Sequence, residues 1–347
     1  MDWRRSYTAS WRVFRVNPAT WADAELVGGV IEASLERSQA DSDKLLEKGS
    51  LTIDVPPGTE FSEGYYRIAM TATQDGESER VDVCTLHCYS ASGDVDRNVD
   101  TLEVTGNSVL YPASKTLLED GSYAPKGIDG IQWCANLLGA AINAPVETMG
   151  SFTLDDHLVF DSGTYALDAV WQVLEAGGGA MQVRGDGTVI VRLVPTEVSL
   201  ELSRANARLL HPGVHHELDF SAVPNRFFAV DGSEKAQVIN DDPASETSTV
   251  RRGWTNDVRE SSPKRINGET LTAYARRRLS ELSTVSDSRT YTREWWPDVL
   301  PYSVVKGGLA DVGIEGDLRV KAQRLTMGRG VTVEEESFRE VTTWQTS

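Results

Sequence analysis

Acidic and amide side chains at alternate positions form the first pattern in this sequence that could do chemistry. The four residues concerned are Asp94, Asp96, Asn98 and Asp100. Oxygen ligands in calcium-binding loops also fall at alternate positions. However, Val99 stands where such a loop needs a glycine for its sharp turn, and no glutamate falls at the twelfth position. The pattern favours a solvated loop, and the sequence alone leaves calcium binding open.

A second candidate is a histidine cluster, which holds three of the five histidines of the chain. His211, His215 and His216 could bind a transition metal through their imidazole nitrogens. Pro212-Gly213 marks a turn between them, so a helix cannot place His211 and His215 on one face. No second cluster supplies further ligands at a suitable spacing. The sequence favours a loop that leads into a strand, and it leaves a metal site open.

The segment Cys84-Thr85-Leu86-His87-Cys88 looks like half of a metal site, but no second Cys/His pair matches it. In a strand, residues 84, 86 and 88 share one face, so we expect two buried thiols. Together with Cys134 they make an odd number of cysteines and no disulfide framework.

The tripeptide Arg184-Gly185-Asp186 is spelled like a cell-adhesion motif. It lies at a Gly-Asp-Gly sequence between two apolar runs, which predicts a tight hairpin turn demanded by backbone geometry. We therefore expect a structural role for it.

Motifs of common enzyme classes are missing from the sequence. It contains no phosphate-binding loop, dinucleotide fingerprint, His-Glu-x-x-His pair or Gly-x-Ser-x-Gly elbow. A pair of carboxylates could serve a glycosidase, but 52 acidic residues make any chosen pair uninformative. We therefore expect no enzyme, no cofactor, and no catalytic, cofactor-binding or metal-binding residue.

Length and charge limit the class of protein. A chain of 347 residues is expected to form two to four domains. With 52 acidic against 34 basic residues, the net charge is −18, which argues against a surface that grips nucleic acid. An acidic surface keeps a protein soluble, and it also suits a wall that DNA must pass without sticking. No apolar window predicts a transmembrane helix, and the N-terminus lacks the apolar run of a secretory signal.

Residues 1–103 read as a first β domain. Apolar residues alternate with polar ones in several short runs, at positions 31 to 35, 51 to 55 and 66 to 72. Gln74-Asp75-Gly76-Glu77 predicts a hairpin connection. Residues 91–100 read as a polar turn region that leads to the first domain boundary.

Residues 104–215 read as a middle α+β region. Helical spacing predicts one helix over residues 128–142, and a second stripe over 167–174 with Thr164 as its N-cap and a stop at Gly177. A hairpin with its turn at residues 185–187 follows.

Residues 216–347 read as a second β domain with one helix over residues 269–282. Asn267 is the expected N-cap, and Arg277 and Glu281 form an expected i,i+4 pair. The arginine run at 276–278 is expected to face solvent or to pair with local carboxylates. In the following strand the apolar phase slips at Arg324, which predicts a bulge.

The order of these segments resembles the tail-hub or baseplate-hub proteins of long-tailed bacteriophages, the family that includes the hub part of tail-associated lysins. Four segments carry the resemblance: residues 11–17 with 65–68, the helix and hairpin over residues 165–189, the strand Asn225-Arg226-Phe227-Phe228-Ala229-Val230-Asp231-Gly232, and the polar excursion that leads to residues 271–275. The closing strands near residues 301–305 and 319–320 also fit. The resemblance spans most of the chain.

The resemblance implies a fold and partners. The fold would be α+β and mainly β, with two tube-like β-barrel or sandwich domains in a homotrimer that forms a pseudo-sixfold ring. The partners would be distal tail and tail-tube proteins, the tape-measure protein and tail-tip or fibre proteins. DNA would pass without specific binding, and no membrane would be bound. The protein would be assembled in the host cytoplasm and work in the virion, at the tail tip. Since the sequence stops at Ser347, any lytic or receptor-binding task is expected to lie in other proteins.

Two other classes stay open from the sequence. Nine Trp, ten Tyr and the acidic balance would also suit a secreted β-rich protein that binds or hydrolyses polysaccharides, against which the missing signal sequence weighs. The other class is the equivalent hub of a contractile injection machine that carries no genome.

Overall fold

The computed structural model describes residues 2–3, 7–40, 43–56, 59–95, 100–204, 213–261, 269–327 and 331–344. By the density of contacts the chain divides into two compact units. The first holds residues 1–213 and 290–337, and the second holds residues 214–289 and 338–347. Among the described residues, no helix is long and apolar enough to cross a membrane.

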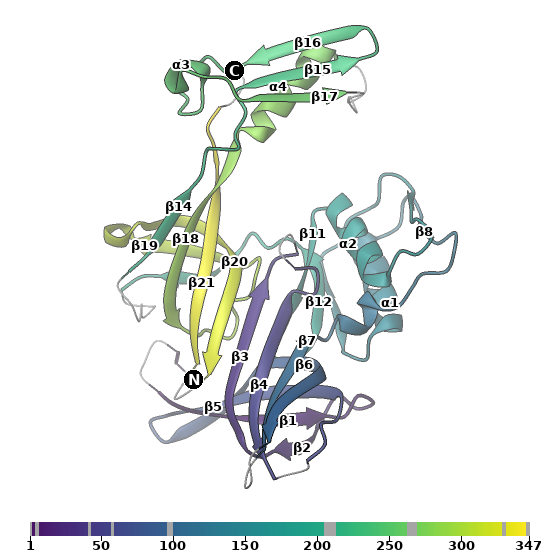
Figure 1. The fold of residues 1–347 in the computed structure, drawn as a ribbon, viewed down its shortest axis with the longest axis vertical. Helices are drawn as coiled ribbons and strands as arrows, with labels where there is room; N and C mark the ends of the chain where they lie inside the picture. The colour runs from purple at the N-terminus through teal and green to yellow at the C-terminus, as the bar shows by residue number, and fades with distance from the viewer. Residues whose placement is uncertain are drawn as a thin grey trace. The chain divides into compact units, whose positions relative to one another are not determined.

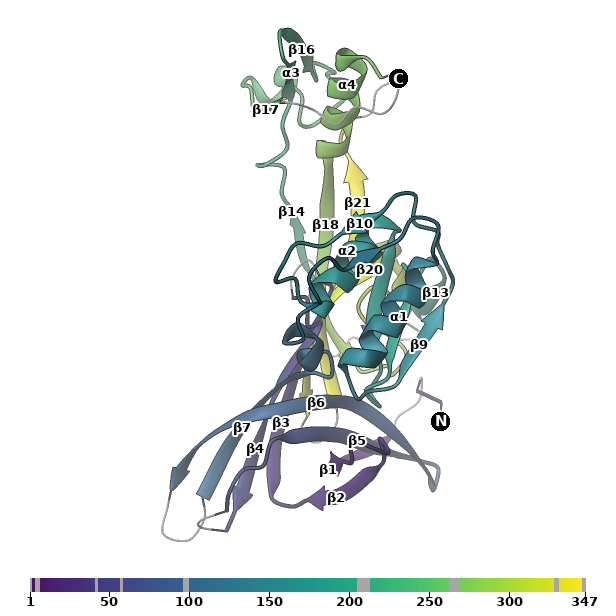
Figure 2. The same cartoon turned by 90° about the vertical axis from the view of Figure 1, so that its right-hand side faces the viewer.

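The first unit begins with strands that pair along one continuous sheet, mostly with their neighbours in sequence (Figure 1). These strands are β1 (Thr8–Val16), β2 (Asp23–Val27), β3 (Val30–Ser38), β4 (Glu47–Val55), β5 (Gly64–Gln74), β6 (Glu77–Val95) and β7 (Asp100–Ser108). The order β3-β4-β7-β6-β5-β1-β2 curves around a common interior, as Figure 2 shows. The described strands do not close into a barrel, because β2 pairs with β1 and ends this order.

The C-terminal strands of the first unit extend the same sheet. They are β13 (Val198–Leu202), β19 (Val304–Leu309) and β20 (Ile314–Met327), with the short helix η2 (Ala310–Val312) and the parts of β18 (Thr284–Glu294) and β21 (Val331–Thr342) that fall in residues 290–337. β20 pairs with β3 in antiparallel register, from Ala322 opposite Ser38 to Met327 opposite Ala33. Leu325 and Val333 therefore share one apolar core with Leu35.

The middle region of the first unit is a small α+β layer. Its elements are η1 (Tyr111–Ser114), β8 (Tyr123–Ala124), α1 (Gly130–Ala141), β9 (Val146–Met149), β10 (Leu158–Val159), α2 (Ala166–Ala176), β11 (Gly179–Val183) and β12 (Val189–Leu193). β11 and β12 form the hairpin, and β9 joins β12 in parallel. The two helices bury Leu138, Val170 and Leu174 in a core with Val191. The side chain of Asp129 caps α1 by accepting from the backbone N–H groups of Ile131 and Gln132.

The second unit contains a three-stranded sheet covered by a helix on one face, and it also holds one short strand and the ends of two others from the large sheet. Its elements are β14 (His215–Leu218), β15 (Arg226–Asp231), β16 (Glu234–Ile239), α3 (Thr249–Arg252), β17 (Asp257–Ser261), α4 (Leu271–Leu282) and the remaining parts of β18 and β21. The sheet has the order β16-β15-β17. Phe227 and Ala229 of β15 pack with Tyr274 and Leu279 of α4.

The mainly β, α+β class predicted from the sequence is confirmed. So are the hairpins at Asp75-Gly76 and at residues 185–187, and the ion pair between Arg277 and Glu281, whose Nη1 and Oε1 atoms lie 2.9 Å apart. Arg278 likewise pairs with local carboxylates, one of them on Glu260. The predicted domain boundaries at residues 103 and 215 stay predictions.

Several local predictions were wrong. Ile31 is 57% exposed, because a register shift between Val30 and Glu32 moves it off the buried face of β3. Residues 91–95 belong to β6 rather than to a turn. The N-cap of α2 is Tyr165 and not Thr164. Thr270 caps α4, and the expected cap Asn267 lies outside the described residues.

The change of apolar phase in β20 is present, but the described pairings show no bulge there. β20 pairs regularly with β19 over residues 314–319 and with β3 over residues 322–327. The buried face changes between Val320 and Gln323, where the pairing partner changes.

Candidate functional site

The metal hypotheses fall mostly on residues that the structure does not describe. Asp96, Asn98 and His211, and the side chain of Asp94, lie outside the described residues, so the structure does not test the two metal sites that the sequence left open. Where the chain is described, no group of three or more His, Cys, Asp and Glu side chains could hold a metal ion.

His216 contributes to an ion-pair cluster in the second unit. Its Nε2 atom lies 2.7 Å from Oδ1 of Asp287, which is 3% exposed. Arg289 donates to the same carboxylate, and Nε of Arg339 donates to Oδ2 at 3.0 Å. A buried carboxylate needs such partners to stay ionised. The cluster therefore explains His216 as a structural residue.

The Asp287 cluster leads to a pH prediction. Burial by itself would raise the pKa of Asp287, but hydrogen bonds from Arg289, His216 and Arg339 outweigh burial and lower that pKa. A carboxyl group whose pKa is lower in the folded state than in the unfolded state stabilises the fold at pH values above its unfolded-state pKa, about 3.9. This stabilisation is lost as the pH falls through the folded-state pKa. We expect wild type to lose this contribution below about pH 4 and Asp287→Asn to lack it throughout. Urea denaturation at a series of pH values measures the free energy of unfolding of both proteins, with Glu217→Gln as the exposed control. If the free energy of unfolding depends on pH equally in wild type and Asp287→Asn, the prediction is contradicted.

The three cysteines are buried free thiols, as predicted for Cys84 and Cys88. Burial raises the pKa of Cys88 to about 12 and raises the pKa of Cys84 further. Thiols with raised pKa values are poor nucleophiles and poor metal ligands. They are packing residues of the core.

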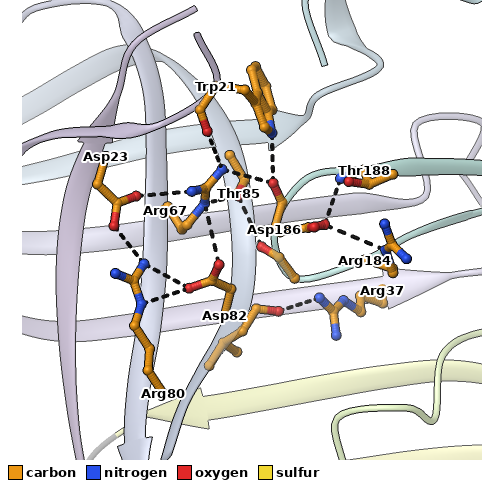
Figure 3. Close-up of polar contacts among 12 residues, drawn as sticks. Trp21, Asp23, Arg37, Arg67, Arg80, Asp82, Thr85, Arg184, Asp186 and Thr188 are labelled. Carbon is orange, nitrogen blue, oxygen red and sulfur yellow. Dashed lines mark hydrogen bonds and ion pairs between the residues drawn. The ribbon is translucent and has the colours of Figure 1, made fainter. Parts of the chain in front are cut away.

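A hairpin turn of the middle region docks on strands β5 and β6 (Figure 3). The backbone carbonyl of Asp186 accepts hydrogen bonds from Nε1 of Trp21 at 2.8 Å and from Nη2 of Arg67 at 2.9 Å. Oγ1 of Thr85 donates to the carbonyl of Gly185 at 3.0 Å. We call this contact the clasp. It fixes the middle region on the first strands of the chain.

Glycine is required at the clasp because the backbones approach closely. A Cβ atom on Gly185 would lie 1.7 Å from the carbonyl oxygen of Asp82. Gly187 has a φ of +82°, and its Cβ would lie 2.8 Å from the ring of Trp21. The Gly-Asp-Gly spacing therefore serves both the turn and its docking.

Arg67 connects the clasp to a network of charged side chains. Besides Asp186 it donates to Oδ1 of Asp23 at 3.0 Å, and Arg80 pairs with both Asp23 and Asp82 (Figure 3). Arg67 is 6% exposed, so its charge needs these partners. The network orients the guanidinium toward the turn.

All three residues of the Arg184-Gly185-Asp186 tripeptide make hydrogen bonds within the protein. The backbone N–H of Gly187 donates to the carbonyl of Arg184 at 2.8 Å, and the carboxylate of Asp186 accepts from the backbone N–H of Thr188 at 2.9 Å. The predicted tight turn is confirmed. The sequence showed the turn, but nothing in it showed the surface to which the turn binds.

The sheet of the first unit carries a polar face opposite the apolar core. On this face one row of hydroxyl side chains crosses five strands, through directly opposed residues: Thr326, Ser34, Ser50, Thr105 and Ser90. The hydroxyls of Ser34 and Ser50 lie 2.9 Å apart, which confirms that they share the face. The alternate residues of the same strands, such as Leu35 and Leu51, are fully buried. We call this surface the hydroxyl face.

The hydroxyl face is also acidic. The next row holds Glu32, Thr52, Glu103 and Ser92. In the row on the other side Glu36 lies between Lys48 and Arg324 and pairs with both. Glu32 and Glu103 are exposed, so their charges project from the face. Small hydroxyls and carboxylates offer a polyanion few attractive contacts.

The alternating pattern of these strands predicted their buried apolar side, and the polar side of the same pattern is the hydroxyl face. Residues 32, 34 and 36, and residues 52 and 54, alternate with the apolar positions of two predicted strands. Strand pairing brings these positions together on one face, and the pairing could not be read from the sequence.

Comparison with known proteins supports an assignment of the fold. No protein-family model matches the sequence, and no curated protein matches it. The structure is similar to the 43 kDa tail protein of prophage MuSo2 from Shewanella oneidensis, with 12% identity, a TM-score of 0.59, and coverage of 94% of this chain and 97% of that chain.

A tail protein from Neisseria meningitidis MC58 is similar to the same degree, with 15% identity, a TM-score of 0.59, and coverage of 96% and 97%. A type VI secretion system component of E. coli, with structural similarity to bacteriophage T4 tail proteins, has 7% identity, a TM-score of 0.52, and coverage of 92% and 76%. The chain has the fold of phage tail proteins over nearly its whole length.

Proposed function

We propose that this chain, which has the fold of phage tail proteins, is a structural hub at the tip of a phage tail. The observation that carries the proposal is the similarity to two tail proteins, one of them from a prophage, across at least 94% of this chain and 97% of theirs. Three copies form a pseudo-sixfold ring that closes or continues the tail tube. The ring works in the virion after assembly in the host cytoplasm, and it does no chemistry.

The open sheet supports a ring. β2 pairs with β1 alone and so leaves one edge of the sheet unpaired among the described strands, with Leu26 exposed on it. Unpaired edges invite pairing with another chain, and a head-to-tail contact closes into a ring when its rotation allows. Neighbouring copies, distal tail and tube proteins, the tape-measure protein and fibre proteins are the proposed partners.

The hydroxyl face supports DNA passage. We assign it to the lumen of the ring, where DNA slides past carboxylates and small hydroxyls and is not held by Lys or Arg. DNA binding by proteins depends on cationic contacts to phosphate. In the three described rows of this face the basic side chains are Lys48 and Arg324, both paired with Glu36.

Charge reversal on the hydroxyl face tests this assignment. We expect Glu32→Lys with Glu103→Lys to create salt-sensitive DNA binding that wild type lacks, and to slow genome release from particles. Fluorescence anisotropy with duplex DNA at two salt concentrations and a DNA-release assay measure these effects. Glu175→Lys, at an exposed position of α2, is the matched control. Normal release from the reversed particle would contradict the lumen assignment.

Cryo-electron microscopy of the purified protein and of the particle tests the proposed function as a whole. We expect threefold symmetry, with the chain at the tail tip next to the tube. A chain found outside the tail, or cell-wall hydrolysis abolished by one carboxylate substitution, would overturn the proposal.

A second candidate is the hub of a contractile injection machine that carries no genome. The similarity to a type VI secretion component favours it. The genes that flank the coding sequence separate the two candidates. Particles that contain DNA select the phage tail.

A further inference from the structure

The three-stranded sheet of the second unit has one face that α4 covers and one that is exposed. Phe227 and Ala229 point to α4, so their neighbours Phe228 and Val230 lie on the other face. Cross-strand register places Lys235 of β16 opposite Val230, and Arg259 of β17 opposite Phe228. We call this surface the basic sheet face.

The basic sheet face combines an apolar centre with positive charge. Arg226 pairs with Asp257, Nε to Oδ1 at 2.7 Å, and its guanidinium lies 5.1 Å from the ring centre of Phe228. Lys235 and Arg259 are exposed beside a groove of about 420 Å³ lined by Phe228 and Val230. Three basic side chains against one acidic side chain leave a net charge of +2, on a chain whose net charge is −18. This face is therefore suited to an acidic partner with apolar side chains.

The middle region of the first unit exposes a surface of the opposite kind. Residues 117–124 run antiparallel to residues 158–165, through the pairs Leu117 with Tyr165 and Tyr123 with Val159. The inner side chains, such as Phe160, pack in the core. The four paired side chains are 40% to 71% exposed. We call this surface the acidic ribbon; β8 marks it in Figure 1.

The charge of the acidic ribbon is of one sign. Glu119, Asp120 and Asp161 lie among its exposed apolar side chains, and residues 117–124 and 158–165 contain no basic residue. The exposed apolar side chains of the acidic ribbon stand in two pairs, and contiguous exposed apolar surface is a mark of contact sites. Its carboxylates would repel a polyanion and most of this acidic chain.

The geometry points to a head-to-tail contact between copies of this chain, in which the acidic ribbon of one copy docks on the basic sheet face of another. The two surfaces match in charge, and both have an apolar centre for burial. Unlike surfaces make the contact heterologous, and three such contacts can close a ring. The inference rests on the proposed function and deepens it by naming the surfaces that join the copies.

Charge exchange tests the contact on the intact chain. The first variant combines Lys235→Glu with Arg259→Glu, and the second combines Glu119→Lys with Asp161→Lys. All four positions are exposed, so the fold should be retained, which circular dichroism checks. We expect each double variant to raise the dissociation constant between copies at least about tenfold in analytical ultracentrifugation. The variant with all four substitutions should regain assembly, because both surfaces have then exchanged charge.

Analytical ultracentrifugation of two control variants shows whether any surface charge reversal weakens assembly. Arg276→Glu on the outer side of α4 and Glu175→Lys on α2 should assemble as wild type. Normal assembly of either double variant, or no recovery with all four substitutions, would overturn the contact. So would duplex DNA binding that Lys235→Glu with Arg259→Glu abolishes while assembly is unchanged.

The failure of this inference and the failure of the proposed function give different results. If wild type and both double variants show the same threefold assembly, the contact is wrong and the hub stands. If wild type stays monomeric at every concentration, the contact is wrong. The cryo-electron microscopy map of the particle then tests separately whether the chain is the hub. A chain absent from the tail tip overturns the hub itself.

Discussion

Replacement of Glu335 by alanine is expected to lower the free energy of unfolding by about 3–5 kcal/mol, because it strands a buried charge. Glu335 is fully buried and pairs with Arg293, which is 1% exposed. The hydroxyl of Tyr291 donates to Oε1 of Glu335 at 2.7 Å, and Nε2 of Gln323 donates to Oε2 at 2.7 Å. Alanine would leave three buried donors without this acceptor. Urea denaturation followed by tryptophan fluorescence measures the loss.

Two further variants separate the charge effect from side-chain volume. Glu334→Ala alters the exposed neighbour on the same strand and is expected to change stability by less than about 0.5 kcal/mol. Glu335→Leu combined with Arg293→Met removes both charges and should recover much of the lost stability. If the double substitution is as unstable as Glu335→Ala, the stranded charge does not explain the effect.

Substitution of Gly185 by alanine is expected to release the clasp and cost about 3 kcal/mol. The new methyl group would meet the backbone carbonyl oxygen of Asp82 at 1.7 Å. The backbone at residue 185 fixes the position of a Cβ atom, so neither atom can rotate away. Displacing the turn would also remove acceptors from Arg67, Trp21 and Thr85. Hydrogen exchange should then speed up at residues 182–189 and at the strand segment around Arg67.

Gly139 supplies the matched control for this substitution. It lies inside α1 with no atom within 4 Å of a built Cβ, so Gly139→Ala should stabilise the helix by about 0.5–1 kcal/mol. A Gly185→Ala protein with wild-type stability and unchanged hydrogen exchange would show that the clasp does not hold the middle region.

Elements that depend on neighbours in sequence were predicted well. The hairpin at Asp75-Gly76 and the turn at residues 185–187 follow from positive-φ residues between alternating strands. Helix α1 follows from the spacing of Ile131, Ala135 and Leu138, which are buried. These signals are local, so the chain around them carries the information needed.

Predictions that depend on pairing between distant segments failed or could not be made. Ile31 was predicted to be buried because it alternates with polar residues in sequence. However, the pairing of β3 with β4 has a register shift between Val30 and Glu32, beside Ile31. The phase change in β20 lies where its partner on one edge changes from β19 to β3, and those two pairings show no bulge. Either arrangement leaves the same local pattern in the sequence.

The candidate sites divide in the same way. The polar halves of the strands were visible in the sequence, but the row from Thr326 to Ser90 exists only because five strands pair in one order. The acidic ribbon could not be predicted, since residues 125–157 separate its two segments, and short pairs such as Tyr123 with Val159 have no strong strand signal.

The sequence by itself determined the mainly β class, the turns, the helices, the buried thiols and the acidic charge, because each depends on composition or on short spacing. Only the tertiary structure decided where the Gly-Asp-Gly turn docks and which polar rows share a face. It also decided that β20 continues the sheet of β3, nearly three hundred residues away in the chain. Contacts of that separation depend on the free energy of the whole fold, which no single stretch of sequence encodes.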